Sequence, residues 1–556
     1  MNQKTDQLRP MLFSALKGYS LSQLGKDMVS GLIVAIIALP LSIALALASG
    51  VNPEQGIYTA IIAGFLISFF GGSRVQIAGP TAAFATIVAG IVASDGINGL
   101  IVATLIAGFL LILMGILRLG SLIKFIPYTI TTGFTAGIAV TILIGQMKDF
   151  FGLTYPAGTV TIETTEKLSA IVQNFSTINL QAFLVGCISL AVLIVWPYIN
   201  KKIPGSLIAV IVGILMVQFL NMKVNTIGDL YTISNRLPSF TLPTISLGII
   251  RKEISNGFTI AILAAIESLL SAVVADTMIN SKHRSNMELV AQGIGNIGSV
   301  LFGGIPATGA IARTAANIKN GGKTPIAGIV HSIVLVVVLV VLMPYASYIP
   351  MPTIAAILFM VAYNMCGWRN FVAVCKKAPK SDIIVLVTTF ILTVVFDLVV
   401  AIGVGMIVAM VLFMKRMTEE SELRGWDYEY TESENDPDAI ELRRVPKEVR
   451  VYEIDGPLFF GVADMLEEIT SKEFTKVLII RMRGVPAIDV TALQGLRNLA
   501  DRADKKHIQL VFSHVNTQPY RTMKKAGFVD RIGEDNFQPH IDDALNRAQR
   551  LLNQED

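Results

Sequence analysis

The stretches Gly71–Phe84 (GGSRVQIAGPTAAF) and Phe302–Thr314 (FGGIPATGAIART) decide the fold, because they repeat one design in two halves of the chain. Each has a Gly-Gly pair at or near its start, crosses a short segment that contains glycine and proline, and then enters a run of small residues. An interrupted helix survives at membrane depth only where its backbone lines a cavity or is buried in protein. Paired interruptions therefore predict two broken helices that meet near the middle of a membrane.

Long apolar runs place both stretches in a membrane. Of the 556 residues, 53% are hydrophobic and 15% are charged, which excludes an ordinary soluble globule. A membrane-spanning helix needs about 20 apolar residues. Such runs are Met28–Gly50, Gly96–Leu117, Phe125–Met147, Ala182–Tyr198, Ile254–Ala275 and Ile383–Met414. We expect an N-terminal cytoplasmic segment over 1–27 and a transmembrane domain over 28–417.

The lysine and arginine residues indicate the orientation. If the N-terminus is cytoplasmic and the spans alternate, most basic loop residues lie on the inner side. The outer loops then hold only Lys148, Lys167, Lys223, Arg236, Arg251 and Lys252. This asymmetry predicts an even number of spans in the cytoplasmic (inner) membrane, with both termini inside.

Two isolated charges mark a buried site. Glu267 is the only charged residue between positions 253 and 276, and Arg313 is the only one between positions 288 and 319. A charge near the middle of a bilayer costs roughly 2.5–3.5 kcal/mol, so such residues usually face a cavity on an ion or substrate path. One acid and one base in apolar spans suggest a site for an anion that travels with a cation. A simple salt bridge that ties two helices together is the structural alternative.

The broken helices supply a chemistry for anion binding. A helix that starts inside the membrane presents free backbone N–H groups and the positive end of its dipole. We expect Pro80 in the first turn of one such helix, with Thr81 and Ala82 directing amides and a hydroxyl at the ligand. Ala312 and Arg313 would supply amides and a fixed positive charge from the other helix.

The chain changes character after residue 417. Acidic residues dominate positions 418–444, which predicts a solvated linker. Over 445–556, buried-strand patterns such as VRVYEI and KVLIIRM alternate with amphipathic helices. This alternation predicts a small cytoplasmic α/β domain.

The motifs resemble the SulP anion transporter family, the relatives of prestin, and the C-terminal domain is similar to a STAS domain. The resemblance covers nearly the whole chain and rests on the following motifs: Gly79–Phe84, Ile266–Asp276, Lys282-His283, Glu288-Leu289, Gln292-Gly293, Gly309–Thr314 and Gly321–Thr324. It implies an α-helical polytopic protein with 14 transmembrane segments in a 7+7 inverted repeat, divided into core and gate, that moves like an elevator. It also implies a homodimer.

The same resemblance completes the site. It implies substrate binding by Pro80, Thr81, Ala82, Ala312 and Arg313. Leu41 and Ser42 of the first span join them, and Glu267 and Ser271 couple a cation. In cyanobacterial bicarbonate members an aspartate stands at the position of Glu267 and helps to hold sodium with a hydroxyl. The longer glutamate here favours a proton, because a buried carboxyl can gain and lose one near neutral pH.

The expected function is secondary active transport of a small anion. The phrases LILMGILRLG, MKDFFGL and AAIESLLSAVVADTM look most like the C4-dicarboxylate branch, with sulfate or bicarbonate as the alternatives. Sodium coupling, an uncoupled exchanger or channel, and a membrane sensor remain open. No nucleotide-binding, protease or nucleic-acid motif is found, so we expect neither an enzyme nor a cofactor. A cytoplasmic regulator of the STAS domain is a further candidate partner. His331 is expected to be packed and hydrogen-bonded.

Overall fold

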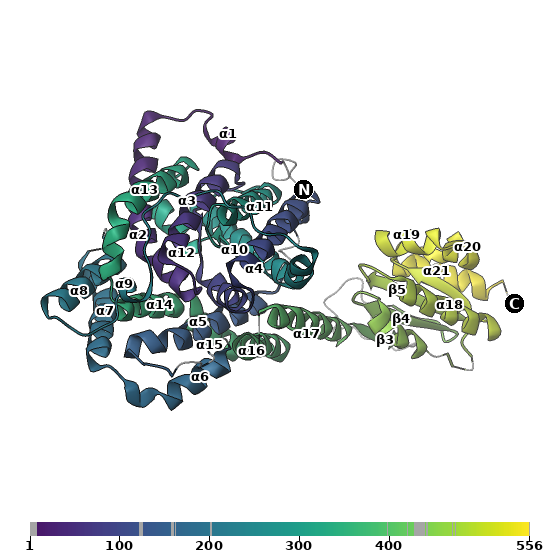
Figure 1. Cartoon of the computed structure of the whole chain (residues 1–556). Coiled ribbons are helices and arrows are strands. Elements are labelled where there is room, and N and C mark those ends of the chain that lie inside the picture. The colour runs from purple at the N-terminus through teal and green to yellow at the C-terminus, as the bar shows by residue number, and fades with distance from the viewer. Residues whose placement is uncertain are drawn as a thin grey trace. The chain divides into compact units, whose positions relative to one another are not determined.

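The structure is a computed structural model. It describes residues 8–121, 126–156, 159, 161, 163–200, 203–396, 398–419, 421–426, 440, 443–469, 471–472 and 474–554. The chain divides into two compact units, Met1–Ile407 and Val408–Asp556 (Figure 1). Each unit is described by itself.

The first unit is helical. Its helices are α1 Met11–Ala15, α2 Leu21–Ala48, α3 Pro53–Phe70, α4 Ala82–Ile116, α5 Tyr128–Phe151, α6 Thr164–Gln173, η3 Phe175–Thr177, α7 Leu180–Ile199, α8 Gly205–Phe219, α9 Ile227–Leu230, α10 Leu247–Ile279, α11 Ser285–Leu301, α12 Ile311–Lys319, α13 Ile326–Leu342, η4 Met343–Tyr348, α14 Met351–Cys366, α15 Trp368–Lys377, α16 Lys380–Val395 and α17 Leu398–Glu419, which runs into the second unit. Its strands are β1 Ala78–Gly79 and β2 Thr308–Gly309. Within the described residues, nine helices are long and apolar enough to cross a membrane. The count of 14 spans stays a prediction.

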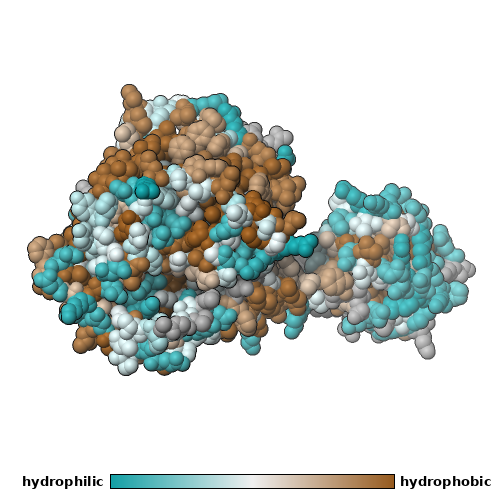
Figure 2. Space-filling view, in the orientation of Figure 1, coloured by the Kyte–Doolittle hydropathy of each residue, from teal (hydrophilic) through white to brown (hydrophobic). Residues whose placement is uncertain are grey.

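The exposed side chains of this unit are suited to contact with an apolar solvent. Large hydrophobic side chains such as Phe109, Phe258, Val337 and Ile407 are more than half exposed. Figure 2 shows hydrophobic residues gathered over much of the visible face of the helical unit. Exposed apolar surface on this scale is unfavourable in water but normal against lipid. The unit is therefore a multi-pass membrane domain.

The helices pack as two bundles. In the first bundle, α4 packs on α10 and α11, α3 packs on α11 and α13, and α2 packs on α13 and α12. In the second, α5 packs on α14 and α16, and α7 packs on α8 and α14. The first bundle carries both broken-helix segments, and we call it the core bundle. The second we call the gate bundle.

The second unit is a five-stranded sheet with helices on both faces. Its elements are β3 Glu422–Trp426, β4 Val449–Asp455, η6 Phe460–Glu467, β5 Val477–Gly484, α18 Val490–Lys505, β6 Gln509–Ser513, α19 Thr517–Lys525, α20 Phe528–Ile532, η7 Glu534–Asn536, β7 Phe537–Gln538 and α21 Ile541–Leu552. The strand order is β3-β4-β5-β6-β7, with β3 antiparallel to β4 and the other pairs parallel. Two apolar clusters fill the two faces of the sheet.

The expected linker over 418–444 is partly wrong. Residues 422–426 form strand β3, which pairs with β4 from Glu422↔Asp455 to Trp426↔Val451. The side chain of Leu423 packs against one of the apolar clusters. A short edge strand tolerates charges on its exposed side, so acidic composition alone did not exclude a strand. Residues 427–439 of the expected linker lie outside the described residues.

A buried carboxylate anchors the segment that leads into β1. Glu288, on α11, is fully buried and accepts hydrogen bonds from the backbone N–H groups of Gly72 (2.8 Å) and Ser73 (3.1 Å). It also accepts from the side-chain amides of Gln76 (2.8 Å) and Gln292 (2.9 Å). These four donors compensate the burial of the charge. They fix the extended chain before β1 against α11.

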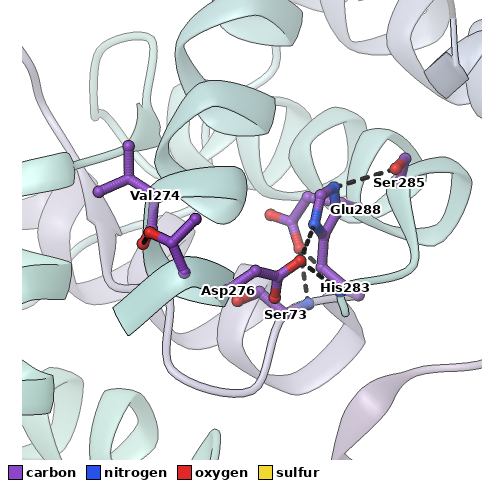
Figure 3. Close-up of polar contacts among 8 residues, drawn as sticks. Ser73, Val274, Asp276, His283, Ser285 and Glu288 are labelled. Atoms are coloured by element: carbon purple, nitrogen blue, oxygen red, sulfur yellow. Dashed lines mark hydrogen bonds and ion pairs between the residues drawn. The ribbon is translucent and has the colours of Figure 1, made fainter. Parts of the chain in front are cut away.

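The turn between α10 and α11 is held by a second set of polar contacts beside Glu288 (Figure 3). Oδ2 of Asp276 lies 2.8 Å from the backbone N of His283 and 2.7 Å from its Nδ1. Nε2 of His283 lies 3.0 Å from Oγ of Ser285. Asp276 thereby links the last turn of α10 to the first residue of α11.

We predict that Glu288 is required for stability rather than for binding. Glu288→Ala would strand two backbone N–H groups and two amides, and each stranded buried donor costs about 1–3 kcal/mol. The free energy of unfolding should fall by roughly 3 kcal/mol or more, and Glu288→Gln should cost less because one acceptor oxygen remains. Thermal unfolding in detergent, followed by tryptophan fluorescence, measures both. An unchanged midpoint for Glu288→Ala would contradict the anchoring role.

Candidate anion-binding site

The two interrupted segments meet inside the core bundle. β1 pairs antiparallel with β2, with Ala78 opposite Gly309 and Gly79 opposite Thr308. The backbone N–H of Ala310 donates to the carbonyl of Ile77 at 2.9 Å, which extends the pairing by one bond. The pair satisfies backbone groups that would otherwise be stranded at membrane depth.

A helix starts directly after each strand. α4 begins at Ala82 with Thr81 as its extended N-cap residue, and α12 begins at Ile311 with Ala310 as its cap. Neither cap residue accepts a side-chain hydrogen bond from its helix. The N–H groups of each first turn therefore have no capping side chain, and both positive helix ends start at the crossing point.

Pro80 lies two positions before the first helical residue, Ala82. The sequence predicts it in the first turn of the helix, but it precedes the cap residue Thr81. The extended backbone of β1 continues through Pro80, whose carbonyl accepts a hydrogen bond from Nη2 of Arg313 at 3.3 Å. Its role in the structure is thus to carry that carbonyl.

The Arg313 side chain joins three elements. It is 1% exposed, and its Nη2 also donates to Oγ of Ser42, on α2, at 3.2 Å. Nη1 lies so close to Gly79 that any side chain at position 79 would overlap it. Nε and Nη1 have no hydrogen-bond partner within the described part of the chain. The guanidinium therefore places its charge directly behind the crossing of β1 and β2.

Glu267 does not pair with Arg313. Among the described residues, the Glu267 carboxylate forms neither a hydrogen bond nor an ion pair, and its side chain is partly exposed. The simple salt-bridge alternative is therefore wrong for this structure. A carboxyl without a local partner remains available to a proton or a cation.

Ser271 lies one helical turn beyond Glu267 and faces α12. Its buried Oγ lies 3.4 Å from Oγ1 of Thr314, and that oxygen accepts the backbone N–H of Ile77 at 3.1 Å. Ser268, which sequence reasoning missed, accepts the N–H of Gly309 in β2 at 3.1 Å. These hydroxyls fix the strand pair against α10.

The inverted repeat contains a sequence signal that could have identified Ser268 as a site residue. Lys26-Asp27 on α2 and Lys252-Glu253 on α10 start parallel patterns, each followed by a glycine four residues after the acid. Fourteen residues after those acids lie Leu41-Ser42 and Glu267-Ser268. Ser42 accepts from Arg313 in the broken-helix segment of the opposite half, and Ser268 accepts from Gly309 in the broken-helix segment of its own half.

The remaining predicted residues border the same place with different exposure. Leu41 and Thr81 are half-buried, and Ala312 is exposed on the first turn of α12. Oγ1 of Thr81 is buried without a partner in the described part of the chain. Among the described residues, direct contacts join Ser42 and Pro80 to Arg313, and Ser271 to Thr314. Leu41, Thr81 and Ala312 are their neighbours in the sequence, and Glu267 lies one helical turn before Ser271.

His331 is packed as expected but is not hydrogen-bonded as expected. It lies on α13, it is fully buried, and its two ring nitrogens have no partner among the described residues. A lone histidine in an apolar run gives no sequence signal for this difference.

Comparison with known proteins agrees with this geometry. Residues 24–389 match the sulfate permease family, and residues 440–544 match the STAS domain. The chain belongs to the sulfate permease family. This confirms the resemblance to SulP transporters that the motifs indicated.

Relatives and solved structures extend over nearly the same length. The putative sulfate transporter YvdB of Bacillus subtilis is 40% identical over 96% of this chain and 99% of its own. The bicarbonate transporter BicA of Picosynechococcus is 30% identical over 94% of both chains. The overall structure of SLC26A9 superposes with a TM-score of 0.86 at 19% identity, covering 99% of this chain and 93% of that one. The transmembrane domain of a cyanobacterial BicA gives 0.61 at 29% identity, covering 69% and 99%.

We predict that Gly79→Ala displaces the Arg313 guanidinium, because the added methyl group would occupy the position of Nη1. Anion affinity should fall about tenfold or more, the loss expected when a buried charge-assisted interaction is broken. The matched control is Gly90→Ala on α4, where nothing lies within 4 Å of the new methyl group. Anion binding to both purified variants in detergent is the measurement. Equal affinities would remove Arg313 from the site.

Proposed function

We propose that the chain is a secondary active anion transporter, with proton symport through Glu267. One observation carries the proposal: two uncapped helix starts and one buried guanidinium converge at a single crossing of broken segments. Free N–H groups at helix starts bind anions with the help of the helix dipole. The relatives YvdB and BicA are named as a putative sulfate transporter and a bicarbonate transporter, which supports the same class.

The residue roles follow from where each group lies. Amides of the first turns at Ala82 and Ala312 would bind the anion, and Thr81 would donate its hydroxyl. Arg313 would act through its charge from behind Gly79, because its side chain is covered. Pro80 and Ser42 hold the guanidinium, and Leu41 borders the accessible side.

Glu267 and Ser271 form the proposed coupling site. Moving a carboxyl away from water favours its neutral form, whereas an arginine stays charged. Glu267 has no competing hydrogen-bond donor in the described structure, so a proton is the simplest partner for its charge. Sodium is the alternative, since the hydroxyl oxygens of Ser271 and Thr314 are of the type that binds hard cations.

The wider architecture is proposed on the same basis. The transport domain would cover 28–417 in the cytoplasmic membrane, with both termini inside, and the protein would form a homodimer. The core bundle would move against the gate bundle. The STAS domain over 445–556 would be regulatory, with a cytoplasmic partner as one candidate regulator.

The substrate that we favour is an inorganic oxyanion. The names of the two relatives described above concern sulfate and bicarbonate, whereas sequence likeness alone favoured a C4-dicarboxylate. The site offers one guanidinium and two helix starts that converge at one crossing. A compact anion fits this single positively charged region better than a molecule with two separated carboxylates.

We predict that Glu267→Gln abolishes accumulation driven by a pH gradient, because the amide cannot carry a proton. Purified protein in liposomes with an acidic exterior should accumulate labelled anion at the wild-type level only when Glu267 is present. Downhill exchange of anion should persist in the variant, which separates lost coupling from lost folding. Accumulation that survives in Glu267→Gln would refute the coupling role.

We predict the order of substrate uptake rates from the single positively charged region of the site. Liposomes tested side by side should take up labelled bicarbonate or sulfate at least about tenfold faster than fumarate, the difference produced by 1.4 kcal/mol. Fumarate as the best substrate would establish the dicarboxylate alternative. Uptake that is unchanged by an imposed proton gradient but rises with external sodium would establish sodium coupling.

A further inference from the structure

The inverted repeat places two buried acids at equivalent positions, but their surroundings differ. Asp27, on α2, is fully buried and accepts from four donors: Tyr19 Oη (2.8 Å), Gln23 Nε2 (3.0 Å), the backbone N–H of Lys323 (2.9 Å) and Thr324 Oγ1 (2.6 Å). Four donors satisfy both carboxylate oxygens. Asp27 therefore suits a permanent charge that clamps the turn between α12 and α13.

Glu253, its counterpart on α10, is also fully buried but has a single donor. Oε2 accepts from Nδ2 of Asn256 at 2.7 Å, and Oε1 has no partner among the described residues. An ionised carboxylate in that position would leave buried lone pairs unsatisfied, which costs several kcal/mol. Another group must therefore compensate the burial of the Glu253 carboxyl group.

A second carboxyl group lies beside it. Asp95, near the end of the first half of α4, pairs with Lys252 and accepts a hydrogen bond from Ser94 Oγ at 2.6 Å. A methyl group on Gly99 would lie 3.1 Å from Oε1 of Glu253 and 2.5 Å from Cβ of Asp95, so the two acidic side chains are neighbours beside Gly99. Two acceptor oxygens in contact can form a hydrogen bond only if a proton lies between them.

The local charges favour keeping one proton. The first half of α4 ends at Gly96, whose φ of 69° breaks the helix, so its negative dipole end points at Asp95. In the described residues, the charged group that contacts the pair is Lys252, which pairs with Asp95. The neighbouring Arg251 on α10 is exposed. The one ammonium that contacts the pair can neutralise one carboxylate. A second ionised carboxylate would be repelled by both Asp95 and the helix end.

We propose that Glu253 and Asp95 form a proton-binding site in which one proton is shared between two carboxyl groups. The site lies at the end of the core bundle opposite the N-terminal segment, because Arg284, near the other end of α10, contacts Arg9 and Pro10. It is about 21 Å along α10 from Glu267, given 1.5 Å per residue. The two sites are therefore distinct.

The shared proton has a mechanical role. It closes the contact between α10 and the kink in α4, and Asn98, on the other side of the kink, exchanges hydrogen bonds with the backbone of Thr244 at 3.0 and 3.1 Å. The first half of α4 runs from this contact to the helix start at Ala82. Loss of the proton would put two like charges in contact and loosen the outer support of that half-helix.

Stability against pH tests the site without a transport assay. A folded state that retains a proton which the unfolded chain releases loses stability as the pH rises. Glu253→Gln removes the buried charge and keeps a donor for Asp95. Its unfolding midpoint should equal that of wild type at pH 5 and exceed it by on the order of 2 °C at pH 8. Asp27→Asn is the matched control and should lower the midpoint at both pH values, because it replaces a saturated acceptor.

Two results would overturn the proposal. One is a Glu253→Gln midpoint that falls below wild type at every pH, as a structural acid like Asp27 would give. The other is a difference from wild type that does not change with pH. If Glu253→Gln does not fold, Asp95→Asn replaces it, since removing the like charge should reduce the fall in midpoint between pH 5 and pH 8. Repeating the comparison in the Glu267→Gln background should leave the difference intact, which separates this site from the proposed coupling site.

Discussion

The backbone pairing of β1 with β2 is the constraint on which the rest of the structure depends. Inside a bilayer, an N–H or carbonyl group without a partner costs several kcal/mol, so a broken helix needs another structure to complete its hydrogen bonds. Two residues from each half complete each other, and Ser268 and Thr314 add hydroxyl acceptors. Because these contacts satisfy the strands, the first turns of α4 and α12 are the backbone groups left to bind a ligand.

The number of hydrogen-bond donors separates two kinds of buried acid in the core bundle. Glu288 and Asp27 each accept from four donors, and each holds a turn beside a broken-helix segment of the other half of the repeat. Among the described residues, Glu253 has one donor and the partly exposed Glu267 has none. A carboxylate that accepts a full set of hydrogen bonds is stabilised in its charged form, whereas a carboxyl group with few donors is stabilised most by binding a proton. Burial alone does not distinguish Glu253 from Glu288 and Asp27, because all three side chains are fully buried.

Sequence reasoning predicted the features that depend on residue type. It failed on the features that depend on which groups within the chain contact one another. The isolated charges, the paired Gly/Pro interruptions and the STAS-like alternation were readable, and the crossing of the two segments followed from them. The separation of Glu267 from Arg313 was not readable, because both charges fit an ion pair until Ser42 and Pro80 are seen to hold the guanidinium. Pro80 was expected in the first helical turn but lies two positions before it, because composition does not fix where an extended segment ends. Strand β3 was missed because its charges resemble those of a linker.

Every residue of the proposed site belongs to the core bundle, on α2, α10, and the segments that begin α4 and α12. The site can therefore move as one body, and its net charge decides how cheaply it crosses the apolar interior. With Glu267 ionised and no ligand, Glu267 and Arg313 cancel. With a monovalent anion bound, the site is neutral only if Glu267 carries a proton. An anion without a proton leaves one negative charge, and a proton without an anion leaves one positive charge. For a monovalent anion such as bicarbonate, the two neutral states are the mobile ones in the proposed mechanism, whereas a divalent anion such as sulfate would need a second proton. Coupling then follows from the cost of moving charge through the membrane without any change in the shape of the site.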